Sequence, residues 1–134
     1  MQSVPGGGHW GGGMVISASD QARVAQLLLD HGRHENQQLI SSDWINQMLT
    51  PCPVAPHYGF FTWLNTGHCV SHSVSEESYF AMGIGGQVIW HDPTRDVLAV
   101  FRWIDMPQLE PMLKRIQTLL AKNELACPNT EAGS

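Results

Sequence analysis

Apolar residues recur at helical spacing in three stretches of the chain, and the first of these follows Ser17. Ser17 and Asp20 have the S-x-x-D spacing of a capping box, in which the serine hydroxyl accepts from a backbone N–H of the first turn. The apolar positions of this stretch are Ala22, Ala25, Leu28 and Leu29. Gly32 follows, and glycine readily adopts the left-handed conformation that often ends a helix. The pattern therefore predicts a helix between Ser17 and Gly32.

Two further helices are predicted. A short one begins at Ser41 or Ser42, either of which can cap it, and Pro51 stops it. Its apolar stripe is Ile45, Met48 and Leu49. The last helix is capped by Asp105, and a loose polar tail begins at Asn123. The apolar positions of this helix are Leu109, Met112, Leu113, Ile116, Leu119 and Leu120.

Between the second and the last helix the pattern changes to that of strands. The predicted strands are residues 58–64, 79–82, 87–91 and 97–103. Residues 97–103 are almost continuously apolar, so both faces of that strand should be covered. Residues 66–78 are polar and predict a surface loop, and residues 92–96 predict a tight turn. Because short turns join antiparallel strands, the fold class is α+β, an antiparallel β-sheet with a helix across one face.

Composition excludes several classes of function. The chain has 134 residues, the length of one domain, and 7 Lys+Arg against 12 Asp+Glu give a net charge of −5. That balance argues against nucleic-acid binding, which requires a basic patch. The sequence has no apolar run of about 18 residues, the length of a membrane span, so we expect no membrane partner. With 43% apolar residues and five tryptophans, the chain can bury a core.

Cysteine and histidine give no clear metal or disulfide pattern. The cysteines are Cys52, Cys69 and Cys127, and a single bridge between the first two stays open. His31 and His34 are three residues apart, and His68, Cys69 and His72 could approach one another. Zinc requires three or four convergent ligands, so scattered solvated histidines are the better interpretation. We expect neither a metal nor another cofactor.

Two glycine-rich segments raise the question of a binding site. Residues 4–14 read V-P-G-G-G-H-W-G-G-G-M and predict a loop, but the G-K-[ST] ending of a phosphate-binding loop is missing. Gly83-Ile84-Gly85-Gly86 lies at a strand end, where small residues leave a backbone N–H open to a substrate. Such a donor could form an oxyanion hole. On local evidence alone, a β-bulge or a glycine-containing hairpin is the favoured interpretation.

The chain holds no recognisable nucleophile, because no serine has a lysine three residues later and no G-x-S-x-G is present. Five segments nevertheless resemble one family in order and spacing. They are G-G-G-H-W-G-G-G-M-V-I-S-A-S-D-Q-A-R, Q-L-I-S-S-D-W-I, Y-G-F-F-T-W-L-N, F-A-M-G-I-G-G-Q-V-I-W-H-D-P and D-V-L-A-V-F-R-W. The family is the serine hydrolases of the β-lactamase and penicillin-binding-protein fold, in particular class C-like esterases and 6-aminohexanoate-dimer hydrolases.

The resemblance spans residues 4–120 but only the C-terminal portion of the family's domain. It implies the C-terminal part of a β-lactamase/transpeptidase-like fold over residues 1–122, incomplete without the N-terminal part, followed by a flexible tail at 123–134. In this family a serine in S-x-x-K attacks an ester or amide, and a tyrosine in Y-x-N shares the proton transfer. Both motifs belong upstream of residues 4–14, so this chain alone should be inactive.

The resemblance also implies the site residues. Gly83, Ile84 and Gly85 match the third-motif strand, with the Ile84 N–H as the oxyanion donor, while His9 and Trp10 could line the pocket. Related enzymes carry K-T-G or H-T-G on this strand, where the cation holds a substrate carboxylate. The matching stretch here is A-M-G at residues 81–83, without a cation. This difference favours a small ester or a linear amide over a β-lactam.

Two hypotheses follow from the resemblance. In the first, the chain is a piece of a serine hydrolase, and alone it exposes a bare strand edge and tends to self-associate. In the second, it is a free-standing, non-catalytic module of the same fold that binds a small ligand or a partner. A cytoplasmic location is expected if Met1 is the true start, and a periplasmic one stays open if the N-terminal part is missing.

Overall fold

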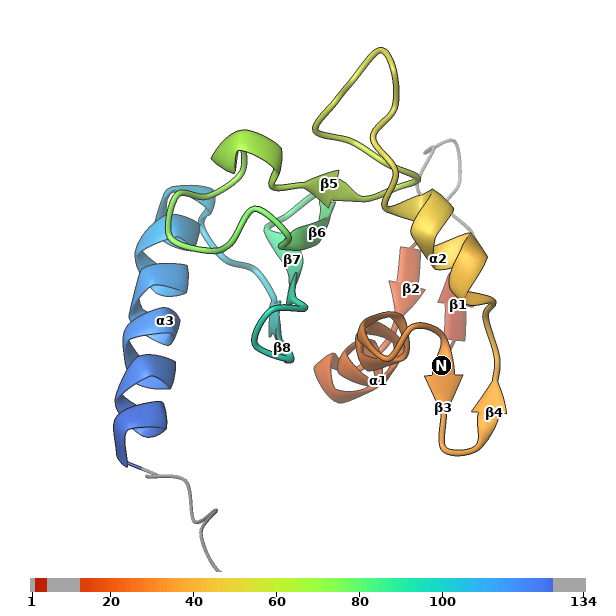
Figure 1. The fold of residues 1–134 in the computed structure, drawn as a ribbon, viewed down its shortest axis with the longest axis horizontal. Coiled ribbons are helices and arrows are strands. Elements are labelled where there is room, and N and C mark those ends of the chain that lie inside the picture. The colour runs from red at the N-terminus through yellow and green to blue at the C-terminus, as the bar shows by residue number, and fades with distance from the viewer. Residues whose placement is uncertain (1, 5–12, 127–134) are drawn as a thin grey trace, which may run out of the picture.

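The computed structural model describes residues 2–4 and 13–126 (Figure 1), which form three α-helices and eight β-strands. The helices are α1 (Ala18–Leu29), α2 (Ser42–Met48) and α3 (Leu109–Ala126). The main sheet is antiparallel, in the order β5 (Trp63–Leu64), β6 (Tyr79–Gly83), β7 (Gln87–Asp92) and β8 (Val97–Phe101). Two hairpins precede it, β1 (Gln2–Val4) with β2 (Gly13–Val15) and β3 (Arg33–His34) with β4 (Gln37–Gln38). The α+β class with antiparallel sheets is confirmed.

Serine caps begin both N-terminal helices. The Ser17 hydroxyl accepts from the Asp20 N–H at 3.1 Å, which confirms the predicted serine cap. The Asp20 carboxylate accepts from the Ser17 hydroxyl at 2.8 Å, rather than from the Ser17 backbone N–H as in a complete capping box. Ser41, rather than Ser42, caps α2 by accepting from the Trp44 N–H. Because a capped helix start satisfies otherwise unpaired N–H groups, these serines fix where α1 and α2 begin.

The sheet is covered on both faces, as the apolar residues 97–103 indicated, whereas the predicted fold class placed a helix across one face only. On one face, Phe80, Val88 and Trp90 pack against Leu109 and Leu113 of α3. On the other face, α1 lies against β7 and β8, and Figure 1 shows the two helices on opposite sides of the strands. The sequence assignment missed this arrangement because the apolar pattern of α1 does not say which surface it covers.

The predicted strand at residues 58–64 is wrong over most of its length. Only Trp63–Leu64 pairs with β6, and the preceding residues fold back, so that the Gly59 N–H donates to the Thr62 carbonyl at 2.8 Å. Phe61 has a φ of 53° within this reversal, a conformation that is uncommon for a bulky residue. Aromatic composition predicts a strand but gives no sign of the turn inside it.

The polar segment 66–78 is anchored by one buried side chain instead of lying free on the surface. Asn65 is fully buried, and its amide donates to the carbonyls of Ser71 and Ser75, both at 2.9 Å. Its carbonyl oxygen accepts from the N–H groups of Val70 and Ser71 at 3.1 and 2.9 Å. Val74 is buried in the core as a result. The predicted surface loop is therefore wrong in part.

β8 is the outer strand of the main sheet among the described residues. It ends at Phe101, earlier than the predicted residue 103, because Trp103 takes a φ of 61° and leaves the extended conformation. All five of its residues are half-buried, which confirms that both faces are covered in part. Only β7 pairs with it in the part of the chain that the structure describes, so the other edge is open.

α3 buries one side of its apolar stripe and exposes the other. Leu109 and Leu113 are buried, whereas Met112 and Leu119 are 42% and 54% exposed. Asp105 precedes a short 3-10 helix, Met106–Gln108, and its carboxylate makes no capping hydrogen bond there. α3 continues to Ala126, so the first residues of the predicted tail at 123–134 are helical.

Candidate functional site

The segment that the sequence singled out forms the turn between β6 and β7. Gly83 pairs with Gln87 at the end of the two strands, and Ile84, Gly85 and Gly86 connect them. Gly85 and Gly86 have φ values of 81° and 69°, in the left-handed region that glycine accepts without strain. Two consecutive glycines with positive φ are typical of the tight connections of β-hairpins.

Close packing explains both of these glycines. A Cβ at Gly86 would lie 1.9 Å from the carbonyl oxygen of Ile104, and one at Gly85 would lie 3.3 Å from the Trp103 ring. The Ile104 N–H also donates to the Gly86 carbonyl at 3.0 Å, which ties the turn to the chain after β8. The local interpretation as a glycine-containing hairpin therefore describes the backbone correctly.

Ile84 is the most exposed position of this turn. Its side chain is fully exposed, and its N–H donates to no acceptor among the residues that the structure describes. The flanking hydrogen bonds of β6 and β7 and the contact with Ile104 hold the turn in place. The turn therefore presents a fixed donor to solvent, and a fixed donor is what an oxyanion requires at about 3 Å.

Two neighbours of the turn were missed by the sequence analysis. Trp103 is 75% exposed and lies against Gly85, and Arg102 donates to the Gln87 side chain at 3.3 Å and to the Ile16 carbonyl at 2.6 Å. The only sequence signal was the F-R-W ending of a strand that was expected to continue. Arg102 thus links the turn region to the chain immediately before α1.

The other predicted site residues are placed as follows. The A-M-G stretch at 81–83 forms the end of β6, and no lysine or histidine stands on it. His9 and Trp10 lie outside the described residues. The structure therefore describes the backbone around Ile84 and leaves the predicted pocket wall outside the described residues.

The histidines lie in separate groups. The His68 and His72 rings are 6.0 Å apart, and His68 Nε2 is 3.5 Å from a Glu76 carboxylate oxygen. His34 lies in the β3–β4 hairpin. Over residues 2–4 and 13–126, no three His, Cys, Asp or Glu side chains are placed to hold a metal ion. Cys52 and Cys69 are free thiols, so the bridge between them that the sequence left open does not form.

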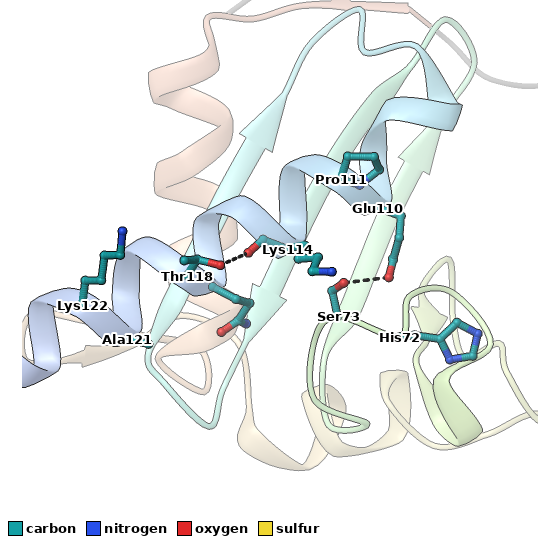
Figure 2. Close-up of a pocket in the computed structure, with 9 residues that line it drawn as sticks. His72, Ser73, Glu110, Pro111, Lys114, Thr118, Ala121 and Lys122 are labelled. Carbon is teal, nitrogen blue, oxygen red and sulfur yellow. Dashed lines mark hydrogen bonds between the residues drawn. The ribbon is translucent and has the colours of Figure 1, made fainter.

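A shallow groove of about 1030 Å³ runs along α3 (Figure 2). One end is closed by the Ser73 hydroxyl, which donates to the Glu110 carboxylate at 2.7 Å, and Lys114 and Lys122 line the helix side. Burial raises the pKa of Glu110, but the Ser71 and Ser73 hydroxyls and the nearby His72 outweigh it, so that the pKa falls below its usual value. The carboxylate thus accepts hydrogen bonds from the loop and is not available as a proton donor near neutral pH.

Comparison of the sequence with known proteins indicates no family for this chain. No protein-family model matches the chain, and no curated protein sequence matches it. Among the described residues, no helix is long and apolar enough to cross a membrane.

Proposed function

We propose that this chain is the C-terminal portion of a serine hydrolase of the β-lactamase and penicillin-binding-protein fold, which acts on an ester or a linear amide through an acyl-enzyme. The observation that carries the proposal is the free Ile84 N–H on the turn between β6 and β7. In the complete site it would donate to the oxyanion that forms when the serine attacks the carbonyl. The second donor would be the N–H of the attacking serine itself.

The surroundings of Ile84 support an uncharged substrate. No cation stands on residues 81–83, and the Arg102 guanidinium donates to Gln87 and to the Ile16 carbonyl. The exposed groups beside the donor are instead the side chains of Ile84 and Trp103. An apolar acyl group fits such a surface better than a carboxylate does, so a small ester or a linear amide is the proposed substrate class.

Two surfaces support the proposal that a further part of the protein completes this fold. The outer edge of β8 has unpaired backbone groups in the described part of the chain, and a bare edge of five apolar residues favours association. On α3, Met112 and Leu119 are exposed although they belong to its apolar stripe. Expressed alone, the chain is therefore expected to self-associate, and a sharply melting monomer would contradict this.

The first test is the DNA sequence upstream of the Met1 codon, read in the same frame. A reading frame that encodes S-x-x-K and then Y-x-N would support a divided hydrolase. A stop codon and a ribosome-binding site directly before Met1 would contradict the proposal. The chain would then be a free-standing binding module of the same fold, and the groove along α3 would be the first surface to screen for ligands.

The second test uses the complete enzyme and the Ile84 backbone. Ile84→Pro removes the N–H at a turn residue outside the paired residues of β6 and β7, whereas Ile84→Ala keeps the N–H and removes only the side chain. Loss of one oxyanion donor lowers kcat by about 10²- to 10³-fold. We expect that loss for Ile84→Pro with a p-nitrophenyl ester, and less than about tenfold for Ile84→Ala. Equal activity of the two variants would contradict the assignment of the Ile84 N–H as the oxyanion donor. The proposed substrate class would be contradicted if the unmodified enzyme hydrolysed a chromogenic cephalosporin faster than the ester.

A further inference from the structure

His91 is buried between the sheet and α1. It is 2% exposed, and on β7 it stands opposite Tyr79 of β6 and Leu98 of β8. Its ring stacks on the Tyr79 ring with centroids 4.3 Å apart and planes inclined by 13°. Directly opposite residues of an antiparallel pair share one face of the sheet, so these three side chains lie together beneath α1.

Neither ring nitrogen of His91 has a hydrogen-bond partner among the described residues. A neutral imidazole carries one N–H donor and one nitrogen acceptor, and both are therefore unpaired in this interface. On α1, the Gln21 side-chain oxygen is also buried without a partner, one helical turn before the buried Ala25. The contact between α1 and the sheet thus holds unsatisfied polar groups, which weaken it relative to an apolar contact.

The groups that face His91 are all neutral. They are the Tyr79 phenol on β6, Ala25 on α1 and Leu98 on β8. The charged residues of α1 and its C-terminal cap are Asp20, Arg23 and Asp30; Asp20 and Arg23 pair with each other, and Asp30 is exposed. The neighbouring Asp92 carboxylate accepts from Thr94 and Gln117. No described carboxylate is therefore placed to stabilise an imidazolium at this position.

We propose that His91 makes the contact between α1 and the sheet sensitive to acid, so that protonation of its ring releases α1 from β7 and β8. The only acceptors that face the ring are the carbonyls of Tyr79 and Ala25, and neither accepts a well-formed hydrogen bond from it. A charged ring with two such poorly paired N–H donors is better stabilised by water, and water reaches it when α1 moves away. Because Arg102 binds the Ile16 carbonyl just before α1, this release also changes the surroundings of the turn at Gly83–Gly86. The inference concerns only this chain and does not depend on the proposed hydrolase.

The direction of the pH effect follows from the environment of the ring. Burial lowers the pKa of His91 from 6.5 to about 4, and the carbonyls of Tyr79 and Ala25 oppose the shift only in part. Because the released ring has the ordinary pKa, the closed contact is fully favoured above pH 6.5 and is lost as the pH falls from 6.5 to about 4. Between pH 7 and pH 5 the ratio of released to closed α1 should rise about 20-fold.

Amide hydrogen exchange of the chain tests this proposal. After correction for intrinsic rates, α1 amides should lose protection about 20-fold between pH 7 and pH 5 while α3 amides keep theirs. His91→Leu removes the titrating group at similar volume and should abolish the pH effect on α1. His34→Leu, at an exposed position of the β3–β4 hairpin, should keep it. Equal loss of protection in α1 and α3, or an unchanged pH effect in His91→Leu, would overturn the proposal.

A second measurement needs no variant. Deuterium exchange at the imidazole C2 position, followed by mass spectrometry, reports the titration and accessibility of each histidine separately. His91 should exchange more slowly than the exposed His34, and the midpoint of its own titration should lie below 6.5. Exchange of His91 as fast as that of His34, with a His91 midpoint at or above 6.5, would overturn the proposal even if His91→Leu fails to fold.

Discussion

The two faces of the main sheet are packed in different ways. On the α3 face, Phe80, Trp90 and Leu113 are fully buried among apolar neighbours, and the Trp90 indole N–H, the one buried polar group of these side chains, donates to the Ser78 hydroxyl at 3.2 Å. On the α1 face, His91 is buried with both nitrogens unpaired. The comparison shows that one sheet carries a face whose buried polar group is paired and a face whose buried polar groups are not.

The difference does not come from the extent of burial, because both faces contain nearly inaccessible residues. It comes from the hydrogen bonds of the buried polar groups. A buried polar group without a partner loses its hydrogen bonds to water and forms none within the protein. Local opening follows the weaker contact, so α1 should separate from the sheet before α3 does. Three sets of substitutions test this ordering, from the largest expected effect to the smallest.

Matched leucine truncations give the largest effects. Leu113→Ala on α3 removes a fully buried side chain from the apolar core and should lower the free energy of unfolding by about 4 kcal/mol. Leu29→Ala at the end of α1 should cost about 2 kcal/mol, because that site is less completely enclosed. Urea denaturation followed by circular dichroism measures both values. A cost for Leu29→Ala equal to or above that of Leu113→Ala would contradict the ordering.

Overpacking of the α1 contact gives an intermediate effect. Ala25 is buried against the sheet, so Ala25→Leu forces α1 outward and should cost about 1–3 kcal/mol. The same substitution at the exposed Ala18 should change stability by less than about 0.5 kcal/mol. Thermal unfolding of the two variants side by side measures the difference. If Ala25→Leu is neutral, α1 is not held tightly enough for His91 to control its position.

Removal of the α1 cap gives the smallest effect. Ser17→Ala deletes the acceptor for the Asp20 N–H and should cost about 1 kcal/mol. The exposed Ser19, two residues later, is the control, and Ser19→Ala should stay within about 0.5 kcal/mol. Amide exchange should show the loss of protection in α1 and not in α3. An equal loss in both helices would mean that the two faces open together.

Local chemistry predicted part of this fold from the sequence. The capping serines, the strands on either side of residues 83–86 and the apolar stripe of α3 all depend on residues close to one another along the chain. The turn at Phe61 and the anchoring role of Asn65 depend on contacts across the fold, and no local pattern signals them.

The same distinction holds for the candidate site. The positive φ values of Gly85 and Gly86 agree with a turn that the glycines themselves predicted. Trp103 and Arg102 join the site only because the chain after β8 returns to the turn. His91 precedes Asp92 at the polar end of its strand, and no local pattern shows that α1 buries it. Long-range contact, rather than residue type, therefore limited the prediction.

The backbone path of segment 66–78 depends on Asn65 more than on most of the segment's own side chains. The Asn65 amide bonds to backbone groups, namely the carbonyls of Ser71, Val74 and Ser75 and the N–H groups of Val70 and Ser71. Backbone groups are the same whatever residues carry them, so the exposed positions of this segment can change in sequence without a change of course. The exposed positions of the segment are thus open to variation and to engineered side chains, provided that Asn65 and the buried Ser71, Val74 and Ser78 are kept.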